Sequence, residues 1–116
     1  MIEQVHLIDP SIFIQDQLVA VFQEKGIKIL TSNSGTDALN LLAKTFPDIV
    51  IMEISLPDHK GITLLKSLRR ALPRTRFIIL ASTLDKETLA EIIRVGIKDV
   101  FINPFCIENL LEKVVA

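Results

Sequence analysis

The sequence lacks several residues that mark common classes of functional site. Its single cysteine, Cys106, cannot form an internal disulfide, and no cluster of cysteine and histidine accompanies it to bind zinc. Tryptophan and tyrosine are absent, and six phenylalanines are the only aromatic residues, so stacking platforms for nucleic-acid bases are not expected. No glycine-rich phosphate loop follows any of the apolar runs, which argues against a nucleotide-binding enzyme.

Charge and hydropathy exclude further classes. The chain has 13 Lys and Arg against 14 Asp and Glu, so no general attraction to nucleic acid or to an anionic membrane is expected. No apolar run approaches the ~20 residues of a membrane helix, and the start of the chain lacks the pattern of a secretion signal. We therefore expect a cytoplasmic protein. With 116 residues, 49% of them hydrophobic, residues 1–116 fit one domain, which can also be one piece of a longer protein.

Five short apolar runs alternate with five longer amphipathic segments. The runs are rich in β-branched residues and apolar at odd and even positions alike, as is typical of parallel strands covered on both faces: 5–8, 27–30, 49–52, 77–80 and 100–102. This alternation predicts an α/β fold, a doubly wound parallel sheet of five strands with helices on both faces. Ligands of such folds bind beyond the carboxyl ends of the strands.

The segments between the runs carry apolar residues at helical spacing. Gly26 and Gly96 are expected to end the first and fourth helices, and Ser34 to cap the second. The positions expected to face the core are Ile14, Leu18, Val21 and Phe22; Ala38, Leu39, Leu42 and Phe46; Ile62, Leu65, Leu68 and Leu72; Leu89, Ile92 and Ile93; and Ile107, Leu110, Leu111 and Val114.

Short motifs near the expected strand ends resemble those of response-regulator receiver domains, the CheY-like domains of two-component signalling. They are Leu7-Ile8-Asp9, residues 35–39, residues 47–50, Leu56-Pro57-Asp58 with Gly61, and Asn103-Pro104-Phe105. The resemblance covers the whole chain. It implies the flavodoxin-like (βα)5 fold with the strand order 2-1-3-4-5 that is known for this family.

The resemblance also implies which positions carry the chemistry of an active receiver. In the family, an aspartate that ends the third strand is phosphorylated, an acidic pair after the first strand holds Mg²⁺, a Thr or Ser ends the fourth strand, and a Lys ends the fifth. Those positions hold Glu53, Asp9 with Pro10, Ala81 and Asn103 in this sequence. Only Asp9 keeps the family's residue type.

These replacements weaken each part of a phosphorylation site. Phosphoryl transfer depends on positioning and on charge stabilisation. Pro10 removes one carboxylate, so the residual metal ligands are Asp9, Glu53 and the carbonyl of Ser55. Asn103 supplies neutral hydrogen bonds, about half as strong as charge-assisted ones.

Two further positions would take part in switching. Ala81 has no hydroxyl, and Val100 stands where the family usually has a switching aromatic residue. We therefore predict an atypical receiver that is not phosphorylated and not an enzyme, with no cofactor unless the residual site still binds Mg²⁺.

Three alternatives stay open at this point. Glu53 is one methylene longer than aspartate, so it can mimic a phosphorylated state. Alternatively, Glu53 or a nearby residue works as a phosphoacceptor with a weakened Mg²⁺ site. The third alternative, an unrelated flavodoxin-like enzyme, lacks a nucleophile paired with a base in the sequence.

The resemblance implies a protein-binding surface formed by the fourth helix, the fifth strand and the fifth helix. A partner protein, an output domain or a second copy is expected there, and neither nucleic acid nor a membrane. The residues expected on this surface are Lys86, Leu89, Glu91, Arg94, Val100, Glu108, Leu111 and Glu112.

Some polar residues have plainer interpretations. His6 and His59 lack partners at metal-ligand spacing, so each is expected to be hydrogen-bonded or to face solvent. Cys106 is expected to be a partly buried packing residue. By resemblance, the Asn103–Pro104 peptide bond is expected to be cis.

A basic stretch at the end of the third helix complements the helix dipole: Lys66, Arg69, Arg70, Arg74 and Arg76.

Overall fold

Five strands and five helices alternate along residues 4–115, the part of the chain that the computed structural model describes. The strands are β1 (Gln4–Ile8), β2 (Lys28–Ser32), β3 (Ile49–Glu53), β4 (Arg76–Ala81) and β5 (Asp99–Ile102). The helices are α1 (Ile12–Glu24), α2 (Gly35–Leu42), α3 (Gly61–Ala71), α4 (Lys86–Val95) and α5 (Ile107–Val115). All pairings are parallel, in the order β2-β1-β3-β4-β5, so the predicted fold class and strand order are confirmed.

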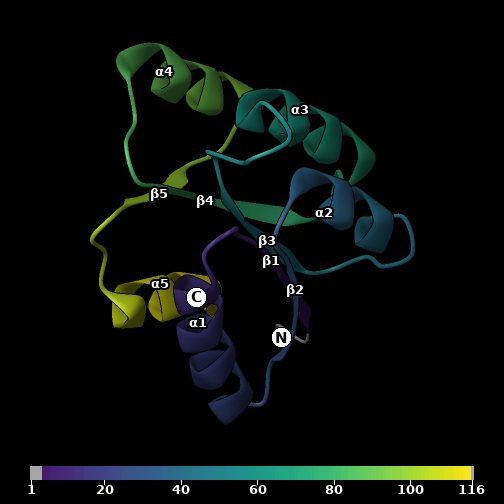
Figure 1. The fold of residues 1–116 in the computed structure, drawn as a ribbon, viewed down its shortest axis with the longest axis vertical. Helices are drawn as coiled ribbons and strands as arrows, with labels where there is room; N and C mark the ends of the chain where they lie inside the picture. Colours follow the sequence, from purple (N-terminus) through teal and green to yellow (C-terminus); the bar gives the residue numbers. More distant parts are fainter. Residues whose placement is uncertain (1–3, 116) are drawn as a thin grey trace.

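The sheet separates two helical layers. Helices α1 and α5 cover one face, and α2, α3 and α4 cover the other (Figure 1). Side chains alternate between the two layers along each strand: on β1, Val5 and Leu7 join the core under α1 and α5, whereas Ile8 joins the core under α2 to α4. The central strand β3 is buried at all five positions, which explains why its sequence is apolar at odd and even positions alike.

Helix ends follow the expected local signals. The Ser11 and Ser34 side chains accept hydrogen bonds from the backbone N–H groups of Ile14 and Asp37 and so cap α1 and α2. Gly26 and Gly96, with φ of 75° and 97°, stand just after α1 and α4 in the left-handed conformation that glycine adopts at low cost. No helix within residues 4–115 is both long and apolar enough to cross a bilayer.

The predicted helical stripes need correction at four positions, Leu39, Phe46, Leu89 and Ile93, whose side chains are exposed. The second stripe was expected to reach Phe46, but α2 ends at Leu42, and the Phe46 side chain is 83% exposed. Pro47 keeps the helix from including Phe46, because the residue before a proline is driven out of the helical conformation. Leu39 and Ile93 are also exposed, since each lies to one side of the narrow stripe that its helix presents to the sheet.

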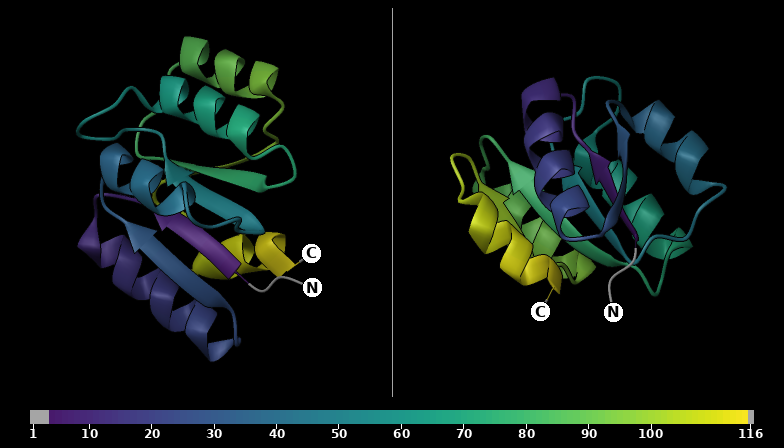
Figure 2. Two further views of the ribbon diagram at one scale, coloured as in Figure 1. Left: turned by 90° about the vertical axis from the view of Figure 1, so that its right-hand side faces the viewer. Right: turned by 90° about the horizontal axis from the view of Figure 1, so that it is seen from below.

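The loop after β3 returns closely onto the strand end. It extends at the end of the sheet opposite to the two chain termini (Figure 2, left). A Cβ atom on Gly61 would stand 1.7 Å from the carbonyl oxygen of Ile54, so only glycine fits where α3 begins. This contact holds α3 against the carboxyl end of β3.

His6 of β1 is fully buried, and its ring has a hydrogen-bond partner at one nitrogen. Its Nε2 atom lies 2.7 Å from Ser32 Oγ, whereas Nδ1 has no hydrogen-bond partner in the described chain. The expectation of a hydrogen-bonded histidine is thus met at one nitrogen only. Burial lowers the pKa of His6 from 6.5 to about 4, because the charged ring would lose its hydration.

We predict that the folded state loses stability as the pH falls through this range. Between 6.5 and about 4 the unfolded chain protonates His6 while the folded chain does not. The contribution of His6 is therefore fully present above pH 6.5 and falls by about 3 kcal/mol at pH 4. Urea unfolding at a series of pH values measures it.

The matched control is the double substitution His6→Leu with Ser32→Ala, which removes both partners of the buried hydrogen bond. The variant should lose this part of the pH dependence, since all carboxyl groups remain the same. Parallel curves for the two proteins between pH 4 and 7 would show that His6 does not titrate as described.

Candidate functional site

Two buried carboxylates meet at the carboxyl end of the sheet. Asp9 follows β1 and Glu53 ends β3, and these strands are neighbours in the sheet. Asp9 is 3% exposed and Glu53 is 5% exposed. The structure therefore brings together the two acidic residues that the sequence singled out.

Asp9 is held by the start of α1. Its Oδ1 atom accepts a hydrogen bond of 2.8 Å from the backbone N–H of Ser11. Burial raises the pKa of Asp9, and the Ser11 N–H offsets part of that rise. The Gln15 side chain donates to the carbonyl oxygens of Asp9 and Ser32, at 2.7 and 3.3 Å, and ties the ends of β1 and β2 together.

Glu53 folds back onto its own loop. Its Oε2 atom accepts from the backbone N–H of Ser55 at 2.9 Å, and its Oε1 atom lies 3.5 Å from Ser82 Oγ. Burial raises the pKa of Glu53 most, and the negative charge of Asp9 raises it further. The sequence did not predict Ser82 as a site residue, because the neighbouring Ala81 occupies the family's hydroxyl position.

The remaining switch positions bring no cation and no second hydroxyl to this end of the sheet. Asn103 is half-buried, and its backbone N–H donates to the carbonyl of Ala81 at 2.8 Å, which joins the ends of β4 and β5. The Asn103–Pro104 peptide bond is cis, as expected. Ala81 is buried, and Val100 packs against the core under α4.

The fit of these residues to Mg²⁺ can be tested on their contacts. Mg²⁺ usually keeps several waters and needs near-octahedral oxygen ligands. Asp9 and Glu53 are almost fully buried and each already accepts a backbone hydrogen bond. Within residues 4–115, no group of three or more His, Cys, Asp or Glu side chains could hold a metal. As arranged, the pair does not fit a hydrated Mg²⁺ ion.

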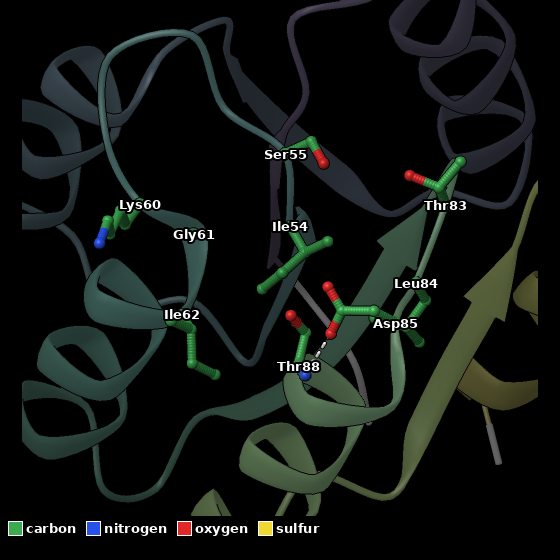
Figure 3. Close-up of a pocket in the computed structure, with 9 residues that line it drawn as sticks. All are labelled: Ile54, Ser55, Lys60, Gly61, Ile62, Thr83, Leu84, Asp85 and Thr88. Carbon is green, nitrogen blue, oxygen red and sulfur yellow. Dashed lines mark hydrogen bonds between the residues drawn. The ribbon is translucent and has the colours of Figure 1, made fainter.

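A pocket of about 540 Å³ lies between the starts of α3 and α4, and Ile54 and Ser55, which directly follow Glu53, line it (Figure 3). The hydroxyl groups of Ser55 and Thr83 line it, and the Asp85 carboxylate caps α4 by accepting from the Thr88 N–H at 2.7 Å. Lys60 also lines the pocket, but its amino group points away from Ser55 and Thr83 (Figure 3). The pocket therefore supplies no cation to the two carboxylates.

Asp58 anchors the loop after β3 to α2, a role that the sequence did not reveal. Its carboxylate accepts from the backbone N–H groups of Gly35 and Thr36 and from the Thr36 hydroxyl, at 2.8 to 2.9 Å. The hydrogen bond from the Thr36 N–H is the largest of the influences that lower the pKa of Asp58 to about 2. The imidazole of His59 lies 3.7 Å from the same carboxylate.

On α4 the residues of the expected protein-binding surface differ in their partners and exposure. Glu91 forms an ion pair of 2.9 Å with Lys66 of α3, so it lies on the side of α4 that faces α3, and its place on the binding surface stays a prediction. Leu89 is 37% exposed, Ile93 is 60% exposed, and the two lie four residues apart on one side of the helix. Ile93 is therefore exposed next to a predicted binding residue. Lys86 and Arg94 are exposed on the same helix.

On α5 and β5 the surface is less apolar than expected. Val100 and Leu111 are partly buried against the two cores, whereas Glu108 and Glu112 are exposed. Ile102 at the end of β5 is 53% exposed. Cys106 is exposed, so its predicted packing role is wrong: its thiol donates to the Glu108 carboxylate at 3.0 Å on the protein surface.

Comparisons with known proteins agree on one family. The family described as "Response regulator receiver domain" matches residues 5–115. The chain is 32% identical to Regulatory protein AtoC of Escherichia coli over 109 residues, which cover 94% of this chain. It is 24% identical to Chemotaxis protein CheY of Bacillus subtilis, with coverage of 98% of this chain and 96% of CheY.

A solved structure agrees on the fold. The CheY-like receiver domain protein of Methanospirillum hungatei superimposes with a TM-score of 0.93 at 19% identity, over 99% of this chain and 92% of that one. The chain spans only 24% of the length of AtoC, so most of that relative lies outside the match.

We predict that Glu53→Gln stabilises the fold at neutral pH. The amide keeps the hydrogen bonds from Ser55 and Ser82 and removes one of two adjacent buried charges. A carboxyl group with a raised pKa destabilises the folded state at high pH, and this cost disappears as the pH falls through the folded pKa toward the ordinary 4.5. The advantage of the variant should therefore shrink on acidification.

Unfolding midpoints of both proteins between pH 4 and 8 measure this difference. The exposed Glu112→Gln substitution is the control and should follow the wild-type curve. A less stable Glu53→Gln variant at pH 8 would mean that the carboxylate has a cation partner in the folded protein.

Proposed function

Because the chain belongs to the response regulator receiver domain family, whose members act in two-component signalling, we propose that it signals by binding proteins without being phosphorylated at Glu53. The observation that carries this proposal is the buried Asp9–Glu53 pair, beside which residues 4–115 place no cation. Burial raises the pKa of Glu53 most and the negative charge of Asp9 raises it further, whereas an acceptor carboxylate next to lysine would be held ionised.

A phosphoryl group at Glu53 would find little to hold it. Its charge would need a cation or metal, because phosphoryl transfer relies almost wholly on electrostatic stabilisation. Asn103 offers only neutral donors, and Ala81 offers no hydroxyl. The 5% exposure of Glu53 also restricts the in-line approach of a phosphate donor. The same features support a protein that is not an enzyme.

Signalling then depends on the outer surface of the domain. We place the main binding surface on the exposed side of α4 and the end of β5, with Leu89, Ile93 and Ile102 as apolar contacts and Lys86 and Arg94 as flanking cations. Its partner can be a domain of the same polypeptide, a separate protein or a second copy. AtoC continues far beyond the matched region, which is compatible with the first arrangement.

We predict that the wild-type chain gains no phosphoryl mass when incubated with Mg²⁺ and a small-molecule donor such as acetyl phosphate. Intact-mass spectrometry makes the measurement. The matched positive control restores the family's residue types through Pro10→Asp, Glu53→Asp, Ala81→Thr and Asn103→Lys. This variant should gain one phosphoryl group, because a second metal ligand and a cation then surround an aspartate. Phosphorylation of the wild type would instead support a working phosphoacceptor.

We predict that the double substitution Leu89→Ser with Ile93→Ser removes protein binding while the domain stays folded, since neither side chain belongs to the two buried cores. Sedimentation velocity over a range of concentrations measures binding to a second copy. Glu91→Gln, on the side of α4 that faces α3, is the control. Self-association that survives the double substitution would place the contact elsewhere.

A further inference from the structure

The amino end of the sheet carries a small pocket for which the proposed function has no use. It lies between the turn that joins α3 to β4 and the turn that joins α4 to β5, and its volume is about 170 Å³. Drug-sized ligands occupy pockets of roughly 300 to 1,000 Å³, whereas a water molecule takes up about 30 Å³. The pocket therefore has room for a small ion and a few waters. Its charged lining residues are Arg69, Arg76, Lys98 and Asp99, and we refer to it as the Arg69 pocket.

Positive charge predominates in the lining of the Arg69 pocket. Asp99 is the only carboxylate among its lining residues, and it is already paired: its Oδ2 atom lies 3.1 Å from Arg76 Nη2, and its Oδ1 atom lies 3.8 Å from the Lys113 amino group. Within residues 4–115 neither Arg69 nor Lys98 forms an ion pair. Three cations against one carboxylate leave a surplus of two positive charges in the lining, which an anion would compensate.

Two of the cations are guanidinium groups that the fold already holds in place. Arg69 Nη1 donates to the carbonyl of Pro73 at 3.2 Å, which ties the side chain to the turn after α3. Arg76 Nη2 donates to the Asp99 carboxylate at 3.1 Å, which joins β4 to β5. A guanidinium carries five N–H donors in a planar fork that matches the oxygens of phosphate, so each group keeps donors for a ligand. Arg69 and Arg76 are half-buried, which strengthens such a contact because water screens it less.

The carboxyl ends of α3 and α4 lie at the same end of the sheet and oppose an anion. Each helix end carries about half a negative charge, so the two together amount to about one charge. The N–H groups of Gly96 and Ile97 already donate to carbonyls in the last turn of α4, and the Leu72 N–H does the same for α3. The surplus of two cations exceeds this opposing charge, so the pocket still attracts an anion.

We propose that the Arg69 pocket binds a phosphate group, which the guanidinium groups of Arg69 and Arg76 and the amino group of Lys98 hold. A phosphate group carries a charge of about −1.5 to −2 at pH 7 and three acceptor oxygens, which matches the surplus of charge and the remaining donors. A carboxylate carries a single charge and would leave half of the surplus uncompensated. A free phosphate ion and a phosphate group on a small organic molecule share this chemistry.

This binding goes beyond the proposed function and does not depend on it. The Arg69 pocket lies at the amino end of the sheet, whereas Asp9 and Glu53 lie at its carboxyl end. None of its lining residues belongs to the binding surface proposed on α4. A domain that fails to bind phosphate here would still signal through that surface, and phosphorylation of Glu53 would leave the pocket unchanged.

The test titrates sodium phosphate into the wild-type chain at neutral pH and constant ionic strength and follows the amide signals by NMR. We expect saturable shifts at Gly96, Ile97 and Lys98, with a dissociation constant of about 1 mM, and an unshifted signal at Ser55. Sodium chloride at the same ionic strength is the reference and should cause no such shifts.

Substitutions of single cations locate the bound phosphate. Arg69→Gln should weaken binding at least about tenfold and Lys98→Gln about threefold, because each removes a charged donor. Lys98 is exposed, so Lys98→Gln tests the site even if Arg69→Gln disturbs the fold. Arg70→Gln is the matched control: Arg70 is exposed next to Arg69 on α3 but does not line the pocket, so the same loss of charge should change the affinity less than about twofold.

Adenosine monophosphate and phosphoserine, titrated in the same way, distinguish the two sources of the phosphate group. Equal affinity for these probes and for phosphate would show that the free ion is sufficient. Tighter binding of either probe, weakened by Arg69→Gln and Lys98→Gln alike, would show that the pocket takes a phosphate group carried by an organic molecule.

Several outcomes would overturn the proposal. Absent shifts, shifts that do not saturate, or shifts that sodium chloride reproduces would mean that phosphate only screens the surface. An equal loss of affinity in Arg70→Gln and Arg69→Gln would show a general attraction by charge in place of a site. Binding that stays unchanged in both Arg69→Gln and Lys98→Gln would place the phosphate elsewhere on the domain.

Discussion

Burial of the central strand β3 on both faces is the constraint on which the rest of the structure depends. Its five residues are all inaccessible, so both helical layers are anchored on it, and its last residue is a carboxylate in a medium of low polarity. An ionised group in such a place needs a partner. Within residues 4–115 Glu53 accepts hydrogen bonds from neutral donors, the Ser55 N–H and the Ser82 hydroxyl among them, and forms no ion pair, so the carboxyl end of this sheet is an acidic site without a compensating cation.

The other carboxylates in the loops at this end of the sheet also accept hydrogen bonds from nearby backbone groups. The Asp9 carboxylate accepts a hydrogen bond from the Ser11 N–H, and the Asp58 carboxylate accepts hydrogen bonds from the N–H groups of Gly35 and Thr36. Backbone donors at the start of a helix therefore satisfy each carboxylate. Such contacts fix the strand-end loops through groups of the protein itself. This arrangement supports the proposal that the domain binds its partners on its outer surface.

The outer side of α4 keeps apolar side chains exposed next to a charged one. Leu89 and Ile93 lie four residues apart, and the exposed Arg94 follows Ile93 directly. Neither Leu89 nor Ile93 belongs to the two buried cores, so the binding surface proposed on α4 can vary without loss of the fold.

The sequence by itself determined the alternation of strands and helices, the capping of α2 by Ser34 and the ends of α1 and α4 at glycine, because these follow from periodicity and local backbone preference. The strand order and the site positions came from family resemblance. Only the tertiary structure decided that Ser82 reaches Glu53, that Glu91 pairs with Lys66, and that Phe46 and Cys106 are exposed. These facts depend on the rotation of each helix about its axis and on distances between residues far apart in the chain, which hydrophobic periodicity does not encode.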